Sequence, residues 1–257
     1  MKKKFWVIIL TILVFLSGAL LGFATVFQVD DVVVEVSAIS EDAKEEAQDI
    51  RAKLIKLYDK ENIFFINEKK ATDIVAEYPH FRVVSFKKDY PNRIMLSVTE
   101  DAEMYAVKKV DTNEYFILGV DGTVLAIRET PDNRLAGTNI VIEGLSVSGD
   151  KGSKLIGDAR LNVILSFCNQ MSERMNGICD NIEKVVVTKN APQLCLYTHE
   201  GVKIYVANPE KSTLIKADKI AEKYLQLSDE ERLVGCILGT DNGEEVFVDY
   251  QKEDINK

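Results

Sequence analysis

The sequence contains few residues that are candidates for catalysis or metal binding. The only histidines are His80 and His199, and neither belongs to a pair at metal-ligand spacing. We expect His80, which follows Pro79 at a predicted helix end, to cap that helix or face solvent, and His199 to lie on the surface. Adjacent acidic residues point in different directions from a helix or strand, which favours solvated faces over catalytic dyads. These pairs are Glu45-Glu46, Glu230-Glu231 and Glu244-Glu245.

The sequence also lacks the motifs of several common active sites. It contains no GxSxG nucleophile motif, no HExxH zinc motif and no GxxxxGK[ST] phosphate-binding loop. We therefore predict no catalytic residue, no metal and no cofactor, and we interpret the chain as a non-enzyme. The cysteines have neither CxxC nor zinc-knuckle spacing, and they are compatible with disulfides or with buried free thiols. They are Cys168, Cys179, Cys195 and Cys236.

Residues near the end of the chain favour a binding function instead. Val246, Val248 and Tyr250 alternate with Phe247 and an aspartate, which predicts a β-strand. A terminal strand commonly lies at a sheet edge, where its backbone can pair with a strand from a partner. We expect Phe247, Val248 and Tyr250, with Val246 beside them, to contact such a partner, because aromatic residues contribute strongly to binding. Tyr224 is a weaker candidate, since it lies on the apolar stripe of a predicted helix, where core packing suits it better.

The elements that position these residues begin with an apolar N-terminal stretch. Residues 5–27 carry no charged side chain and follow three lysines. A helix of this length can cross a hydrocarbon core about 30 Å thick, and the lysines favour a cytoplasmic location for residues 1–4. We predict a single-pass anchor in the cell membrane, with residues 28–257 outside. A cleaved signal peptide is the alternative, although its apolar core usually spans only about 7–15 residues.

The charge of the chain limits its partners. The formal net charge is −9, and the region outside the membrane lacks the three N-terminal lysines, so it is more acidic still. Such a surface repels nucleic acid and anionic lipid headgroups. We therefore expect the lipid bilayer to contact residues 5–27, and we expect no nucleic acid partner.

Residues 28–100 predict a first domain with the order βααββ. Ser40 and Asn67 are typical N-caps of two helices, and Pro79 follows the end of the second helix. The two helices can cover one face of a three-stranded sheet. Strands are expected at residues 32–36, 81–88 and 94–99.

Residues 101–250 predict a second α+β domain with a mainly antiparallel sheet, followed by a polar tail at 251–257. Asp121-Gly122 is typical of a hairpin turn. Two amphipathic helices are expected, at about 158–175 and 212–227. The second helix carries apolar residues that we expect to face the core, namely Leu214, Ala217, Ala221, Tyr224 and Leu225. Strands are expected near 105–107, 115–120, 123–127, 182–188, 194–198, 202–206, 233–238 and 245–250.

Four segments share the pattern of a known family. They are NIFFI at residues 62–66, YPHFRV at 78–83, KKDYPNRIMLSVTE at 87–100 and YFILGVDGTVL at 115–125. The first three resemble the POTRA domain of the FtsQ/DivIB family of bacterial cell division proteins, and the fourth resembles the opening hairpin of that family's next domain. An N-terminal anchor directly before them agrees with the family's architecture. One difference is Glu100-Asp101-Ala102-Glu103, where the family often has Glu-Arg-x-Pro, so the junction loses a positive charge and a proline.

The resemblance implies a fold and a set of partners. The fold is an α+β protein with a transmembrane helix, a POTRA domain at 28–100 and an FtsQ/DivIB-type β domain at 101–250. The late strand and the helix before it would bind coiled-coil membrane proteins of the FtsB (or DivIC) and FtsL type. Lys87, Lys88 and Arg93 form a basic spot beside the turn at 89–92; a solvated turn is the plain interpretation, and contact with other division proteins is the functional one.

We therefore predict a non-catalytic division scaffold, enriched at the septum, that links these partners to septal wall synthases. A membrane-anchored POTRA subunit of an export or sporulation complex is the alternative. An anchored wall hydrolase would need paired carboxylates or an activated nucleophile, and none of the motifs searched for supplies one.

Overall fold

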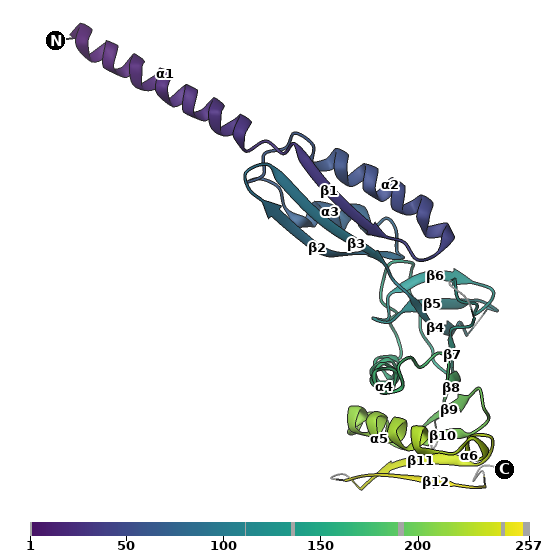
Figure 1. Cartoon of the computed structure of the whole chain (residues 1–257). Helices are drawn as coiled ribbons and strands as arrows, with labels where there is room; N and C mark the ends of the chain where they lie inside the picture. The colour runs from purple at the N-terminus through teal and green to yellow at the C-terminus, as the bar shows by residue number, and fades with distance from the viewer. Residues whose placement is uncertain (1, 111, 135–136, 190–192, 243–244, 254–257) are drawn as a thin grey trace. The chain divides into compact units, whose positions relative to one another are not determined.

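The computed structural model begins with a long apolar helix, α1, over Lys2–Val26 (Figure 1). Its segment Ile9–Val26 has a mean hydropathy of 2.4 and is long and apolar enough to cross a membrane. This helix is compatible with a single-pass membrane protein.

Two compact units make up the chain, unit 1 over Met1–Glu100 and unit 2 over Asp101–Lys257. Each unit has its own hydrophobic core. The structure describes residues 2–110, 112–134, 137–189, 193–242 and 245–253. Glu244 of the third acidic pair and most of the predicted polar tail lie outside these residues.

Unit 1 follows α1 with the order βααββ. Its strands pair in the order β1-β3-β2, with β1 parallel and β2 antiparallel to the central strand β3. Ile94, Leu96 and Val98 of β3 are buried under the two helices, because residues two apart in a strand share a face. The elements are β1 Asp31–Ser37, α2 Glu41–Tyr58, α3 Glu68–Val75, β2 Phe81–Asp89 and β3 Arg93–Glu100.

Capping side chains determine where these helices begin. Ser40 Oγ accepts a hydrogen bond from the N–H of Ala43 at 3.3 Å, and Asn67 caps α3 in the same way. Glu100 is 5% exposed, and its carboxylate accepts from the N–H of Ile39 at 2.6 Å and of Ser40 at 2.9 Å. The Ser40 hydroxyl also donates to Glu100, at 2.6 Å. The end of β3 therefore holds the start of α2 in place.

Unit 2 contains a nine-stranded sheet in the order β12-β11-β10-β9-β8-β7-β4-β5-β6. The pairs β4–β7, β7–β8 and β10–β11 are parallel, and the other neighbouring pairs are antiparallel. Helices α4 and α5 cover one face of the sheet (Figure 1), where their apolar residues join one large core. The strands are β4 Glu103–Lys108, β5 Tyr115–Gly119, β6 Val124–Arg128, β7 Ile140–Glu143, β8 Ile182–Val187, β9 Leu194–Thr198, β10 Lys203–Val206, β11 Cys236–Asp241 and β12 Val246–Gln251, and the helices are α4 Arg160–Met175, α5 Thr213–Gln226 and α6 Asp229–Arg232.

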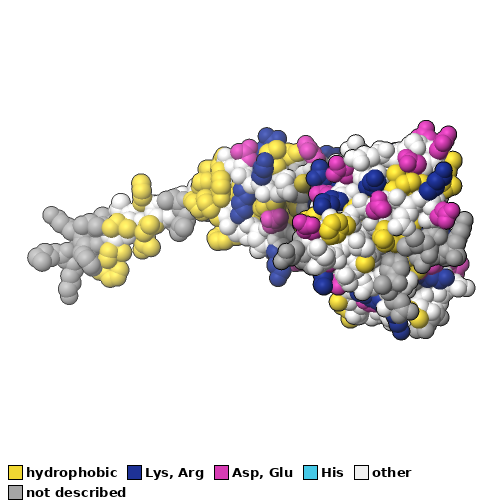
Figure 2. Space-filling view, turned by 90° about the horizontal axis from the view of Figure 1, so that it is seen from below, with side chains coloured by type: hydrophobic (Ala, Val, Ile, Leu, Met, Phe, Trp, Pro, Cys, Tyr) yellow, Lys and Arg dark blue, Asp and Glu magenta, His cyan; other side chains and the backbone are white. Residues whose placement is uncertain are grey.

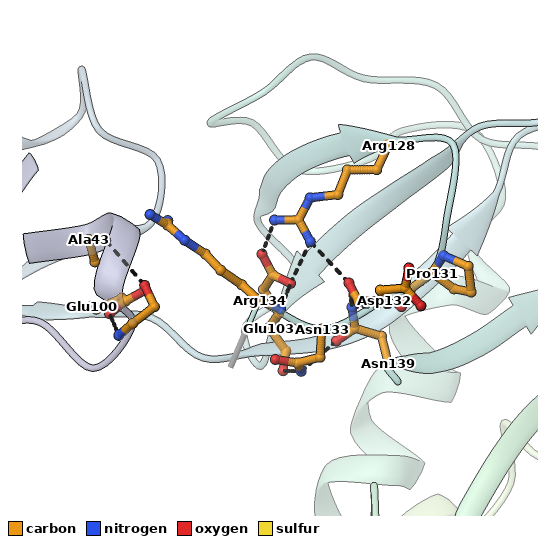
Figure 3. Close-up of polar contacts among 10 residues, drawn as sticks. Ala43, Glu100, Glu103, Arg128, Pro131, Asp132, Asn133, Arg134 and Asn139 are labelled. Atoms are coloured by element: carbon orange, nitrogen blue, oxygen red, sulfur yellow. Dashed lines mark hydrogen bonds and ion pairs between the residues drawn. The ribbon is translucent and has the colours of Figure 1, made fainter. Parts of the chain in front are cut away.

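Glu103, at the start of β4, organises one end of this sheet. The Arg128 guanidinium donates to both carboxylate oxygens of Glu103, at 2.5 and 2.9 Å (Figure 3). The N–H of Arg134 donates to the same carboxylate at 2.9 Å, and the Asn133 amide donates to the Glu103 carbonyl at 2.9 Å. Glu100 thus secures unit 1, and Glu103, which stands where the resembled family has a proline, secures unit 2.

The structure corrects three expectations. His80 is 6% exposed, so a solvent-facing position is wrong; it lies directly before buried Phe81, where the chain enters the core of unit 1. The predicted apolar stripe of the late helix is also wrong at both ends, because Leu214 and Leu225 are 53% and 48% exposed. Lys216 takes an inward position on this helix instead.

The third correction concerns the elements between the predicted ones. Strand β7 and helix α6 were not expected, and β11 begins at Cys236 rather than at residue 233. Helix α6 and Gly235, whose φ is +77°, delay the start of that strand.

Candidate partner-binding site

Strand β12 lies at one edge of the sheet of unit 2 (Figure 1, yellow). It pairs with β11 in an antiparallel register that runs from Asp241 opposite Val246 to Cys236 opposite Gln251. Among the described strands it has no neighbour on its other side. The sequence predicted a strand here and an edge position for it.

The hairpin turn determines which backbone groups of β12 face the open edge. The N–H of Asn242 donates to the carbonyl of Glu245 across the turn, at 3.2 Å, so these residues form a hydrogen-bonded pair. Hydrogen-bonded and non-hydrogen-bonded pairs alternate along an antiparallel ladder. The N–H and C=O groups of Val246, Val248 and Tyr250 therefore point away from β11.

A contact from α5 agrees with this direction. Lys219 donates from Nζ to the carbonyl of Val246 at 2.8 Å. The lysine thus ties α5 to the edge strand and occupies the first outward carbonyl. A partner strand would bond to the outward groups further along, at Val248 and Tyr250.

The side chains of β12 divide between two faces. Val246 is buried, and Val248 and Tyr250 are half-buried against the core under α5. The Tyr250 hydroxyl lies 3.3 Å from the carbonyls of Glu231 and Val234, and burial raises the pKa of Tyr250. Phe247 lies on the opposite face and is 50% exposed. Of the predicted contact residues, Phe247 exposes its side chain to solvent, whereas Val248 and Tyr250 direct backbone N–H and C=O groups to the open edge.

A buried ion pair fixes α5 against this hairpin. The side chains of Lys216 on α5 and Asp241 on β11 form a salt bridge and are 0% and 3% exposed. The Lys216 ammonium also donates to the carbonyls of Ala207 and Asn208, each at 2.7 Å. Because a buried ammonium must be paired, this pairing turns the helix and moves Leu214 and Leu225 to its surface. The sequence pattern did not reveal it, since a lysine reads as a surface residue.

Apolar side chains are exposed on the outer side of α5. Ile215 is 54% exposed and lies four residues before Lys219, so the two share one side of the helix. Together with Asp218, Glu222 and Leu225, these residues line a surface groove that Arg174 of α4 completes. Arg174 and Asp218 form an ion pair at 2.8 Å across it. The groove and the β12 edge are joined by Lys219.

Tyr224 is fully buried, in agreement with the core role that its position favoured. Its hydroxyl donates to Glu200 at 2.8 Å, and the Arg232 guanidinium lies 5.0 Å from the ring centre. Burial, followed by the hydrogen bond to Glu200, raises the pKa of Tyr224. Tyr224 therefore supports the candidate site from below and does not present its side chain to a partner.

The basic spot of unit 1 lies on both sides of the β2–β3 turn. Lys87 is exposed and sits opposite Met95, and Lys88 is half-buried opposite Ile94. The Arg93 guanidinium lies 3.0 Å from the Asp31 carboxylate. Arg93 is thus paired within the unit, and Lys87 is the most accessible of the three.

Within the described residues, no group of three or more His, Cys, Asp or Glu side chains is placed to hold a metal ion. A hollow of about 300 Å³ lies beside the start of α4, and the ionisable groups along its described lining are Arg160, Lys189 and Glu210. Arg160 is already bound to Asp158 at 2.6 Å.

The four cysteines carry free thiols. Cys168 is fully buried, and burial raises its pKa to about 12. Burial also raises the pKa of Cys179. These thiols lie within or against apolar clusters of unit 2, where they act as packing residues.

Comparison with known proteins gives one distant similarity. No family model matches the chain. The chain is 26% identical over 119 residues to the cell division protein DivIB of Clostridium acetobutylicum. The match covers 46% of this chain and 45% of that protein, so it spans about half the length of each. The comparison thus supports a distant kinship with the FtsQ/DivIB family.

Proposed function

We propose that the chain is a non-catalytic scaffold of bacterial cell division, anchored in the cell membrane by α1. The similarity to a DivIB protein supports a role in cell division, and the apolar helix supports a location in the membrane. The orientation follows from the N-terminal lysines, which favour the cytoplasmic side. In this orientation the POTRA-type part of unit 1 that follows α1 lies outside the membrane together with unit 2, where septal wall synthesis takes place.

The observation that carries the proposal is the open edge of β12 beside the exposed apolar side of α5. Strand addition at this edge would use the outward backbone groups of Val248 and Tyr250, with Phe247 as a side-chain anchor. The groove that contains Ile215 and Leu225 suits the apolar face of a helix. The partners we infer are coiled-coil membrane proteins of the FtsB or DivIC and FtsL type.

Confinement to the membrane makes weak contacts sufficient. An anchored domain and an anchored partner meet at a high effective concentration, so a short strand pairing can hold them together. The scaffold would in this way link the coiled-coil pair to septal wall synthases. The basic spot around Lys87 offers a second contact surface for division proteins near the membrane.

A proline substitution tests the edge directly. Val248→Pro removes an outward N–H and leaves the bonds to β11 in place, because proline is tolerated at an edge strand. Val248→Thr is the matched control, since it keeps both the N–H and the branched side chain. We expect the proline variant of the full chain to bind a purified FtsB/DivIC-type and FtsL-type pair about tenfold more weakly, and the threonine variant to bind normally. Equal binding by both folded variants would exclude strand addition at β12.

The cellular role has its own test. A fluorescent protein fused before Lys2 should form a band at midcell before constriction begins in the native host. An even membrane outline throughout the cell cycle would contradict the division role and leave the fold unaffected.

A further inference from the structure

An aromatic cluster surrounds the point where α1 joins the rest of unit 1. Phe23 lies in the last turn of α1, and Phe27 directly follows the helix. Their ring centres lie 5.3 and 4.8 Å, respectively, from the ring centre of Phe64. Phe64 in turn lies 5.4 Å from Tyr90 at the β2–β3 turn. Figure 2 shows hydrophobic side chains gathered at this junction.

These rings are open to solvent. Phe64 is 45% exposed, Tyr90 is 54% exposed and the neighbouring Phe65 is 78% exposed. Large apolar side chains gathered in one exposed patch commonly mark a binding surface. The patch is continuous with the apolar helix itself, because Phe23 is 46% exposed and belongs to the segment Ile9–Val26.

The backbone holds this patch close to the helix end. The N–H of Ile63 donates to the carbonyl of Phe27 at 2.9 Å, and Val29 exchanges bonds with Glu61 and Lys60 at 2.8 and 3.0 Å. On the other side, the N–H of Asp30 donates to the carbonyl of Asn92 at 3.0 Å. Both aromatic loops are therefore bonded to the segment that leaves the helix, with no free linker between them.

The position of Phe23 sets the height of the patch relative to a bilayer. Trp6 and Phe27 lie 21 positions apart on and just after α1, which corresponds to about 32 Å of helix and matches a hydrocarbon core about 30 Å thick. Phe64 stacks on Phe23, which lies inside this interval. If the helix spans the membrane, the Phe64 ring reaches the boundary between acyl chains and headgroups, where aromatic side chains are enriched.

We propose that Phe64, Phe65 and Tyr90 dock unit 1 on the outer surface of the lipid bilayer. This inference rests on the membrane anchoring proposed above. The partner is the lipid interface itself, because the patch continues the surface of the spanning helix. Insertion of the rings is apolar and does not require anionic lipid, so it is compatible with an acidic protein. Lys87 and Lys88, next to the same turn, then lie at headgroup height.

Tryptophan fluorescence can measure the depth of the patch. Trp6 is the only tryptophan of the chain, so Trp6→Phe gives a background into which single probes are placed. Phe65→Trp and Tyr90→Trp report the patch. Ile39→Trp is the matched control, because Ile39 is 59% exposed and lies beyond the far end of β1, about 26 Å from its start.

Each full-length variant is reconstituted into neutral phosphatidylcholine vesicles with and without bromine on the acyl chains. We expect brominated lipid to quench Phe65→Trp and Tyr90→Trp strongly, with emission shifted to the blue, and to leave Ile39→Trp unchanged. The docking inference is overturned if both patch probes behave like Ile39→Trp, provided that circular dichroism shows folded protein.

The native Trp6 separates this inference from the membrane anchoring on which it rests. If brominated lipid quenches Trp6 but neither Phe65→Trp nor Tyr90→Trp, the docking inference is overturned and the membrane anchoring is retained. Absence of Trp6 quenching by brominated lipid would overturn both.

Discussion

Lys216 and Asp241 form an ion pair from which solvent is almost entirely excluded, and this pair joins helix α5 to the strand next to the open edge. Removing one partner of such a pair leaves a buried charge without compensation, and this typically costs about 3–5 kcal/mol. The geometry of the candidate site therefore depends on a contact that no partner would touch.

Asp241→Asn is expected to lower the free energy of unfolding of unit 2 by about 3–5 kcal/mol. The thiol of buried Cys168 provides a local probe, because all four cysteines lie in unit 2. Its labelling rate in urea, with the other cysteines replaced, gives the midpoint of unfolding. Asp218→Asn is the control, since the ion pair of half-buried Asp218 with exposed Arg174 should contribute about 0–1 kcal/mol. Similar midpoints for the two variants would refute the structural role of Lys216.

Phe247→Ser should weaken partner binding without altering stability. The ring is 50% exposed and lies on the face of β12 opposite the core under α5, so the free energy of unfolding should change by less than about 0.5 kcal/mol. Loss of an aromatic anchor costs about 2 kcal/mol in binding, or roughly 30-fold in affinity. Ile127→Ser on β6, 38% exposed at the opposite edge of the same sheet, is the matched control. Calorimetric titration of the coiled-coil pair would show whether the two edges differ.

Gly235→Ala should loosen β12. Gly235 has a φ of +77°, and an added Cβ would lie 2.2 Å from the carbonyl oxygen of Gln251 in the paired strand. Gly137 has a similar φ of +82° with open space around it, so Gly137→Ala carries only the backbone cost of about 1–2 kcal/mol. Amide hydrogen exchange should therefore rise across β11 and β12 in the first variant alone. Equal amide hydrogen exchange across β12 in both variants would show that the strand tolerates the added methyl group at position 235.

Alkaline pH should destabilise unit 2 partly through Cys168. Burial raises the pKa of the Cys168 thiol in the folded state to about 12, from its ordinary value of 9.0. Between these two values the unfolded thiol releases its proton and the folded one keeps it. The stabilising contribution is complete below the lower value and is lost as the pH rises toward the higher one, by up to about 1.4 kcal/mol per pH unit.

Cys168→Ala tests this linkage. The variant starts from a lower free energy of unfolding, because removing the thiol leaves a cavity. Its free energy of unfolding should nevertheless decline less steeply above pH 9 than that of the unsubstituted chain. Cys179→Ala should change the slope less, because Cys179 is only partly buried. Urea unfolding followed by far-ultraviolet circular dichroism gives the slope of stability against pH for each of the three proteins, and identical slopes would contradict the assignment.

Local signals made much of the fold predictable. Ser40 and Asn67 cap the helices that their sequence context indicated. The apolar stripe of α4 is buried throughout, as expected, from Leu161 to Met175. Such features depend on residues close together in the chain, so the period of the sequence is sufficient to find them.

Long-range features were not predictable in the same way. The inward position of Lys216 depends on Asp241, which is distant in sequence, and hydrophobicity alone assigned that side of α5 to Leu214 and Leu225. Strand β7 has only four residues, and its parallel pairing with β4 and β8 joins segments far apart in the chain. The apolar run Ile140-Val141-Ile142 between Asn139 and Gly144 was the available signal for it. For the candidate site, the sequence was sufficient to predict the edge strand. It did not show that Val248 and Tyr250 present backbone groups while Phe247 presents its ring, because that depends on the pairing register of β12 with β11.

The bonded exit of α1 has a mechanical consequence. β1 starts five residues after the helix ends and pairs with the central strand over seven residues, from Asp31 opposite Arg93 to Ser37 opposite Thr99. A pull on the anchor would load these hydrogen bonds together, in shear, and would not peel them apart one at a time. The attachment of unit 1 to its helix is thus built to carry tension.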